Sequence, residues 1–84
     1  MKFYYVTFRS VTFAQRAEQL LQKNGIRSTL LRTPRWMEAQ GCGYSLRLWT
    51  HDIRTPVDLL RRNQANFQRV YIQISDGTLE EIEP

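Results

Sequence analysis

Two kinds of apolar repeat alternate along this 84-residue chain, and their order limits the folds that it can adopt. Alternating aromatic and β-branched residues predict four strands, at 2–8, 26–32, 44–50 and 69–75. Apolar residues at helical spacing predict one helix between the first two strands and another between the last two. We therefore expect the order β-α-β-β-α-β in a single domain spanning residues 1–84.

The ends of both helices carry their own signals. Thr12 and Gln15 form a capping box for the first helix, and Gly25 marks its end. In the second helix we expect Thr55 as the N-cap and Pro56 in the first turn. The apolar residues expected to face the core are Phe13, Ala17, Leu20, Leu21, Val57 and Leu60.

The simplest architecture with this order is an α+β, ferredoxin-like sandwich, in which a four-stranded antiparallel sheet carries both helices on one face. Right-handed crossovers then place the third strand between the first two. The connection 33–43 should lie where the first strand enters the first helix, and His51 at the opposite end of the sheet. Asp76-Gly77 predicts a turn, after which residues 78–82 fold back as a short C-terminal β arm.

The only cysteine, Cys42, stands between Gly41 and Gly43. Glycine reaches backbone angles that other residues reach only at a cost, and it leaves the sulfur uncrowded. The expected topology places Cys42 beside the N-terminus of the first helix, near Arg9 and with Arg35 in the same loop. A helix N-terminus and arginine both favour the thiolate, which is the nucleophilic form. The alternative is a structural cysteine, buried in a tight turn.

Other kinds of cysteine chemistry lack partners in this sequence. His51 is the only histidine, and its expected place is too far away for a Cys–His pair. One cysteine and one histidine cannot form a structural zinc site alone. We therefore expect no metal and no cofactor. Because no general base is identifiable, a carrier or accessory protein is expected more than a stand-alone enzyme.

The sheet face turned away from the helices combines aromatic and basic side chains. Alternation assigns Tyr5, Arg47, Trp49 and Tyr71 to this open face. Interface cores are rich in tyrosine, tryptophan and arginine, so a homodimer through this face is the first interpretation. Stacking on nucleic-acid bases is a less favoured one, because the aromatic consensus of RNA-recognition domains is absent. A solvated or arm-covered face is the third.

The charge and the single thiol bear on partners and compartment. Residues 1–75 hold 12 basic side chains against four acidic ones, a formal charge of +8, and ten of the twelve are arginine. This balance favours an anionic partner, with a merely solvated basic face as the alternative. A free thiol fits a reducing cytosol, and no stretch approaches the roughly 20 apolar residues of a membrane span. We expect a cytoplasmic protein with no membrane partner.

Residues 25–47 resemble a family of short bacterial proteins described as selenium/sulfur carrier-like. The motifs that carry the likeness are Gly25, Thr33-Pro34-Arg35 and Gly41-Cys42-Gly43, followed by Leu46 and Arg47, with Phe8 and Ser10 before the first helix. The resemblance implies a sulfur or selenium carrier centred on Cys42, with a donor or acceptor protein as its partner. A binding or oligomerisation module with a structural cysteine, or a basic nucleic-acid-binding domain, are the alternatives.

Overall fold

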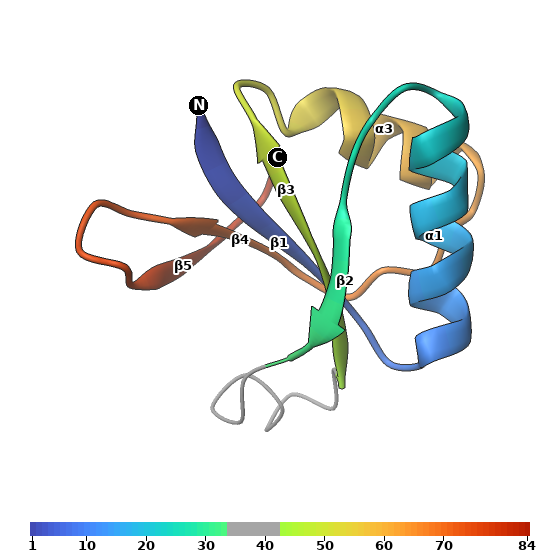
Figure 1. Ribbon diagram of the computed structural model, residues 1–84, viewed down its shortest axis with the longest axis horizontal. Helices are drawn as coiled ribbons and strands as arrows, with labels where there is room; N and C mark the ends of the chain where they lie inside the picture. The colour runs from blue at the N-terminus through green and yellow to red at the C-terminus, as the bar shows by residue number, and fades with distance from the viewer. Residues whose placement is uncertain (34–42) are drawn as a thin grey trace.

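The computed structural model describes residues 1–33 and 43–84, and that part of the chain forms an α+β fold with two helices and a five-stranded antiparallel sheet (Figure 1). The elements are β1 (Lys2–Phe8), α1 (Val11–Lys23), β2 (Thr29–Arg32), β3 (Tyr44–Thr50), α3 (Arg54–Arg62), β4 (Val70–Gln73) and β5 (Leu79–Ile82). Both helices lie on the same side of the sheet. Neither of them has the length and apolar character needed to cross a membrane.

Strand β3 lies between β1 and β2 and pairs antiparallel with both. Its seven residues pair with all seven of β1, from Phe8↔Tyr44 to Lys2↔Thr50. Strand β4 pairs with the other edge of β1, so the strand order is β2-β3-β1-β4-β5. The predicted bounds of the first and third strands are confirmed, as is the position of the third strand between the first two.

The sheet has five strands where four were predicted, because the C-terminal arm joins the sheet as β5. This strand pairs with β4 of its own chain, from Gln73↔Leu79 to Val70↔Ile82. The turn between them uses Gly77 at a φ of +88°, a backbone conformation that favours glycine. Hydrogen bonds from the hydroxyl and the backbone N–H of Thr78 to the Asp76 carboxylate hold the pKa of Asp76 below its ordinary value.

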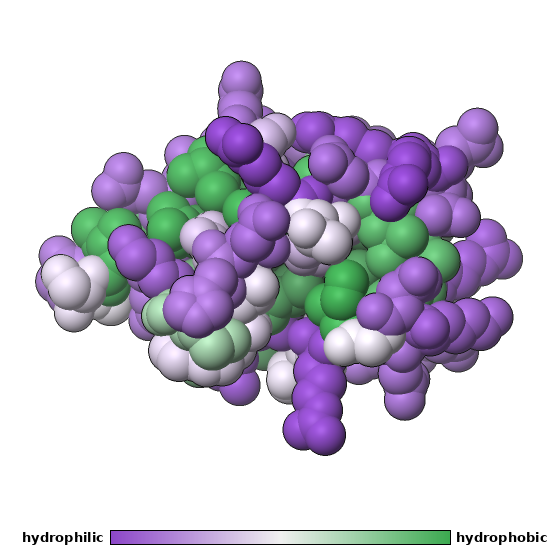
Figure 2. Space-filling view, turned by 90° about the horizontal axis from the view of Figure 1, so that it is seen from above, coloured by the Kyte–Doolittle hydropathy of each residue, from purple (hydrophilic) through white to green (hydrophobic). Residues whose placement is uncertain are grey.

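The core fills the space between the helices and one face of the sheet. Every second residue of β1 and β3 points into it, as the alternation predicts. Its main members are Tyr4, Val6, Phe8, Leu46, Leu48 and Val70 from the sheet, with Ala14, Ala17, Leu21, Val57 and Leu60 from the helices. Phe13 was expected in the core but is 36% exposed, and Ala14 takes its place. Seen from above, hydrophilic side chains cover much of the surface and apolar groups show between them (Figure 2).

The hydrogen bonds that end α1 explain why β2 begins later than predicted. The N–H of Gly25 donates to the carbonyl oxygen of Gln22 at 3.1 Å, and that of Ile26 to Leu21 at 2.9 Å. This Schellman motif needs a residue in the left-handed conformation, and Gly25 has a φ of +76°. Ile26 therefore belongs to the end of the helix, and β2 starts only at Thr29.

Helix α1 begins before its predicted cap. Its first residue is Val11, and the Ser10 hydroxyl oxygen accepts a hydrogen bond from the N–H of Phe13 at 3.2 Å. Thr12 is an exposed residue of the first turn, so the prediction that it caps the helix is wrong. Serine and threonine two positions apart both fit the N-cap preference, and the sequence alone does not choose between them.

Helix α3 also begins before its predicted cap. It starts at Arg54, one residue ahead of Thr55. The carboxylate of Asp52 accepts hydrogen bonds from the N–H of Arg54 at 2.9 Å and from the hydroxyl of Thr55 at 3.1 Å. Asp52 therefore takes the accepting role that was predicted for Thr55.

Replacing the true cap of α1 should destabilise the fold more than replacing its neighbour. Ser10→Ala leaves the N–H of Phe13 without its side-chain acceptor, and we expect it to lower the free energy of unfolding by about 1 kcal/mol. Thr12→Ala is the matched control and should change it by less than about 0.5 kcal/mol. Urea unfolding followed by circular dichroism measures both. Equal losses in the two variants would contradict the assignment of Ser10 as the cap.

The motif that ends α3 places a glutamine in the left-handed conformation. Gln64 has a φ of +56°, its N–H donates to Arg61 at 3.1 Å, and the N–H of Ala65 donates to Leu60 at 2.9 Å. Left-handed backbone costs a residue with a Cβ roughly 1–2 kcal/mol. We expect Gln64→Gly to raise the free energy of unfolding by about 1 kcal/mol. The control is Gln15→Gly at an exposed position inside α1, which should lower the free energy of unfolding by about as much. The same urea titration checks the pair, and a loss at both positions would disprove the prediction.

Candidate functional site

The segment that joins β2 to β3 contains the only cysteine. The predicted site residues Arg35, Gly41 and Cys42 lie outside the described residues. The segment is flanked by Thr33 and Gly43, and the Thr33 N–H donates to the Gly43 carbonyl oxygen at 3.0 Å. Because Tyr44 pairs with Phe8, these flanking residues lie at the end of the sheet where β1 leads into α1. This is the end that the sequence predicts for the connection.

Two predicted supporting residues, Arg9 and Gly43, are described at this end of the sheet. Arg9 follows β1 and is exposed, and the described part of the chain offers it no ion-pair partner. Gly43 is not in the left-handed conformation, and a Cβ added to it would meet no atom within 4 Å. Neither the backbone nor the packing of the described chain therefore requires glycine at position 43.

Three buried hydroxyl side chains lie near the same end, on the sheet face turned away from the helices. Thr7, Thr33 and Ser45, which we call the hydroxyl row, are only 1%, 3% and 0% exposed. The oxygens of Thr33 and Ser45 are 2.7 Å apart, and this hydrogen bond ties β2 to β3. The Thr7 hydroxyl accepts from the N–H of Arg69 at 3.1 Å and donates to the carbonyl oxygen of Arg69 at 3.3 Å. Alternation marks Thr7 and Ser45 as facing outward, Thr33 falls in the predicted connection 33–43, and nothing in the sequence signals that the three are buried.

At the other end of the same face, aromatic and basic side chains pack together. Phe3 and Trp49 are cross-strand partners whose ring centres are 4.5 Å apart at an angle of 48°. The Arg47 guanidinium lies 5.0 Å from the centre of the Phe3 ring. We call Phe3, Arg47 and Trp49 the aromatic cluster. The Trp49 side chain is 53% exposed, so this end of the face is accessible to a partner.

The remaining predicted open-face residues, Tyr5 and Tyr71, are less accessible. They pair with each other across β1 and β4, Tyr5 being half-buried and Tyr71 only 8% exposed. On its other side, Tyr71 pairs with Glu81 of the C-terminal arm, whose carboxylate accepts a hydrogen bond from Arg69 at 2.7 Å. Tyr71, predicted for the open face, is therefore buried beside β5, which agrees with the alternative of an arm-covered face.

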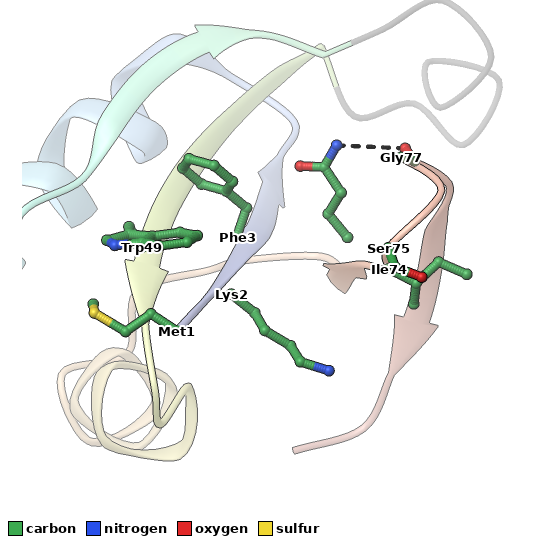
Figure 3. A pocket seen from close by; sticks show the side chains of 8 residues that line it. Met1, Lys2, Phe3, Trp49, Ile74, Ser75 and Gly77 are labelled. Atoms are coloured by element: carbon green, nitrogen blue, oxygen red, sulfur yellow. Dashed lines mark hydrogen bonds between the residues drawn. The ribbon is translucent and has the colours of Figure 1, made fainter.

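Two hollows flank Trp49. The larger, about 420 Å³, lies between the aromatic rings and the β4–β5 hairpin, and Figure 3 shows Phe3 and Trp49 on one side of it and Ser75 on the other. The smaller, about 320 Å³, lies toward the start of β2. Lys2 lines the larger hollow and Arg27 the smaller one. Each hollow thus combines the indole of Trp49 with one basic side chain.

His51 lies far from the flanks of the cysteine segment. It follows β3 and is exposed, at the end of the sheet opposite Gly43, where it was predicted. Within residues 1–33 and 43–84, no three side chains of histidine, cysteine, aspartate or glutamate gather in a way that could hold a metal ion.

A family model matches residues 3–72, which run from β1 into β4. The family is described as "Putative Se/S carrier protein-like". The matched interval includes Cys42, the hydroxyl row and the aromatic cluster. No curated protein and no solved structure matches the chain.

The hydrogen bond between Thr33 and Ser45 predicts coupled effects on stability. Thr33→Val and Ser45→Ala each leave one buried hydroxyl without its partner, and each should lower the free energy of unfolding by about 1–3 kcal/mol. The double variant should lose less than the sum, with a coupling energy of about 0.5–3 kcal/mol. Thr29→Val on the exposed side of β2 is the control. Urea unfolding of the wild type, the two single variants and the double variant gives the double-mutant cycle, and strictly additive losses would contradict the predicted coupling.

Proposed function

Because the chain belongs to the Putative Se/S carrier protein-like family, we propose that it carries sulfur or selenium on the thiol of Cys42. The supporting observation is that the family match spans residues 3–72, and Cys42 is the only cysteine in that interval and in the whole sequence. A covalent carrier of sulfur or selenium needs a nucleophilic thiolate, and no other side chain of this chain supplies a thiol.

Loading from a persulfide donor balances without any oxidant or reductant. The Cys42 thiolate attacks the terminal sulfur of a donor R–S–S–H. A new S–S bond forms to Cys42 as the S–S bond of the donor breaks, and R–S⁻ leaves with the electron pair. The proton stays on the transferred sulfur or passes to solvent. Delivery to an acceptor thiolate is the same displacement in reverse, and a donor R–S–Se–H would load selenium in the same way.

Arg9, Arg35 and the start of α1 stabilise the thiolate in this proposal. The positive end of a helix and a guanidinium both favour a nearby anion over the neutral thiol. Arg9 is exposed at the end of β1 that leads into α1, and Arg35 belongs to the same segment as Cys42. Gly41 and Gly43 add no side chains that would crowd the approaching donor. A carrier of this kind needs no general base, since the thiolate is already deprotonated.

The proposed carrier role also indicates which partners and which compartment to expect. A carrier meets a donor and an acceptor in turn, so we propose transient contacts with proteins that handle persulfide or selenide. A thiol that must stay reduced between cycles suits the cytoplasm.

We assign β1–β4 with α1 and α3 to the ferredoxin-like class, with β5 as an added arm.

Intact mass spectrometry after incubation with a low-molecular-weight persulfide tests the carrier role. We expect the wild type to gain the mass of one sulfur and Cys42→Ser to gain none. Gly43→Ala is a matched control, because a Cβ at this position meets no other atom, and it should load and unfold like the wild type. A wild-type protein that never gains sulfur would contradict the proposal.

The rate at which Cys42 is alkylated at different pH values gives the carrier proposal a second test. The Cys42 thiol should titrate below the value of about 8.5 that is usual for free cysteine. Arg9→Ala should slow alkylation at neutral pH about two- to fivefold, as expected for losing one exposed favourable charge. Arg62→Ala, at the exposed end of α3, should leave the rate unchanged. A thiol that titrates at or above the free value, or that never reacts in the native protein, would indicate a structural cysteine.

A further inference from the structure

The aromatic cluster and the two hollows beside Trp49 have no part in the proposed thiol chemistry. Phe3 lies four residues along β1 from Thr7 of the hydroxyl row, a distance of roughly 13 Å at the usual rise of a strand. Gly43, which follows Cys42, lies at the hydroxyl-row end, just before Tyr44. The cluster is therefore a separate feature at the other end of the sheet.

Four neighbouring segments build a single row across this end of the face. Trp49 of β3 pairs with Phe3 of β1. Arg27, before β2, shares the smaller hollow with Trp49, and Gln73 of β4 shares the larger hollow with Phe3. Three inter-strand spacings make the row about 14 Å wide. A sheet of this kind offers room for the two or three bases that RNA-recognition sheets stack on their aromatic side chains.

The charged side chains that line the two hollows beside Trp49 are basic among the described residues. Lys2 and Arg27 are exposed in the two hollows, and Arg47 rests on the ring of Phe3. Neither hollow is lined by an acidic side chain among the described residues. In the same part of the chain, neither Lys2 nor Arg27 has an ion-pair partner. An exposed indole between two cations that lack an ion-pair partner within residues 1–33 and 43–84 complements a ligand that has flat rings linked by negative groups.

We propose that this end of the sheet binds single-stranded nucleic acid, with a base stacked on Trp49 and backbone phosphates held by Lys2 and Arg27. Base–aromatic stacking next to a positively charged path is the general mode of single-strand recognition. Stacking needs an accessible ring face, which the exposed Trp49 provides. Arg47 fixes the Phe3 ring beside Trp49 and adds positive charge to the same row.

The extent of the surface argues against a second copy of this chain as the occupant. A stable interface buries about 800 Å² on each partner and has an apolar centre. Among the described residues, the large hydrophobic side chains that are exposed are Met1, Phe13 and Trp49, and Phe13 belongs to α1 in the other layer. A two-fold axis would also bring the same patch of both copies together and set its cations against each other.

Fluorescence anisotropy with labelled short oligouridine RNA and oligothymidine DNA tests the proposal. Trp49→Ala should weaken binding about tenfold or more, in line with the loss of one stacked base. Trp49→Phe keeps a flat ring and should retain most of the affinity. Phe13→Ala removes an exposed ring from the helix layer and should have no effect. Binding of both probes equally would reflect stacking and phosphate contacts, and a preference for RNA would add a contact to the 2′-hydroxyl; both outcomes support the proposal.

The salt dependence of the same measurement tests the phosphate contacts. Arg27→Ala should reduce the slope of log affinity against log salt by about 0.7, the value for one phosphate contact on a single strand. Arg54→Ala, which removes another exposed arginine, at the start of α3, should leave the slope unchanged. Cys42→Ser should bind like the wild type, so failure of the carrier role and failure of this site are separable. The proposal would be overturned by a wild type that binds neither probe, or by a Trp49→Ala variant that binds like the wild type. It would also be overturned if light scattering showed a dimer and Trp49 were buried in its interface.

Discussion

The antiparallel register between β1 and β3 is the constraint on which the rest of the structure depends. Side chains alternate along a strand, so a slip of one residue would turn every core side chain of one strand toward the opposite face. Val6 and Leu46, which are paired and almost fully buried, hold this register in place. The same register sets Phe8 beside Tyr44 at one end of the sheet and Phe3 beside Trp49 at the other. Both candidate sites thus take their positions from the core.

The two ends of the outer sheet face have opposite physical character. Near Gly43, hydroxyl groups are buried and satisfied by each other or by backbone, which ties β2, β3 and β1 together. Near Trp49, the indole is exposed, and Lys2 and Arg27 in the two hollows have no ion-pair partner in the described part of the chain. The residues that flank the cysteine segment therefore lie in a part of the sheet held by several hydrogen bonds, whereas the aromatic cluster offers an accessible surface. Under the two proposals, this division lets one small domain carry a reactive thiol at one place and bind a partner at another.

The sequence predicted best where one signal acts alone. The bounds of β1 and β3 follow from uninterrupted alternation, and no competing pattern overlaps them. The cap of α1 was misassigned because Ser10 and Thr12 both fit, and the late start of β2 depends on backbone hydrogen bonds that Ile26 makes to the helix. At the candidate sites, alternation assigns Trp49 and Tyr71 to the same face, and the structure exposes the first and buries the second. Alternation could not reveal that Tyr71 is buried, because exposure depends on which strand lies beside it.

The described glycines differ in whether the backbone of this chain requires them. Gly25 and Gly77 have positive φ values and serve a helix end and a hairpin turn. Gly43 has no such backbone, and a side chain there would meet nothing in the described structure. In the proposed carrier role, a glycine that folding does not require keeps the sulfur of Cys42 accessible. A persulfide displacement needs the donor sulfur in line with the attacking thiolate, and a protein donor must bring its own backbone close to do this. In the carrier proposal, glycine beside the thiol suits the approach of a protein donor, whereas a low-molecular-weight persulfide needs no such room and should load Gly43→Ala like the wild type.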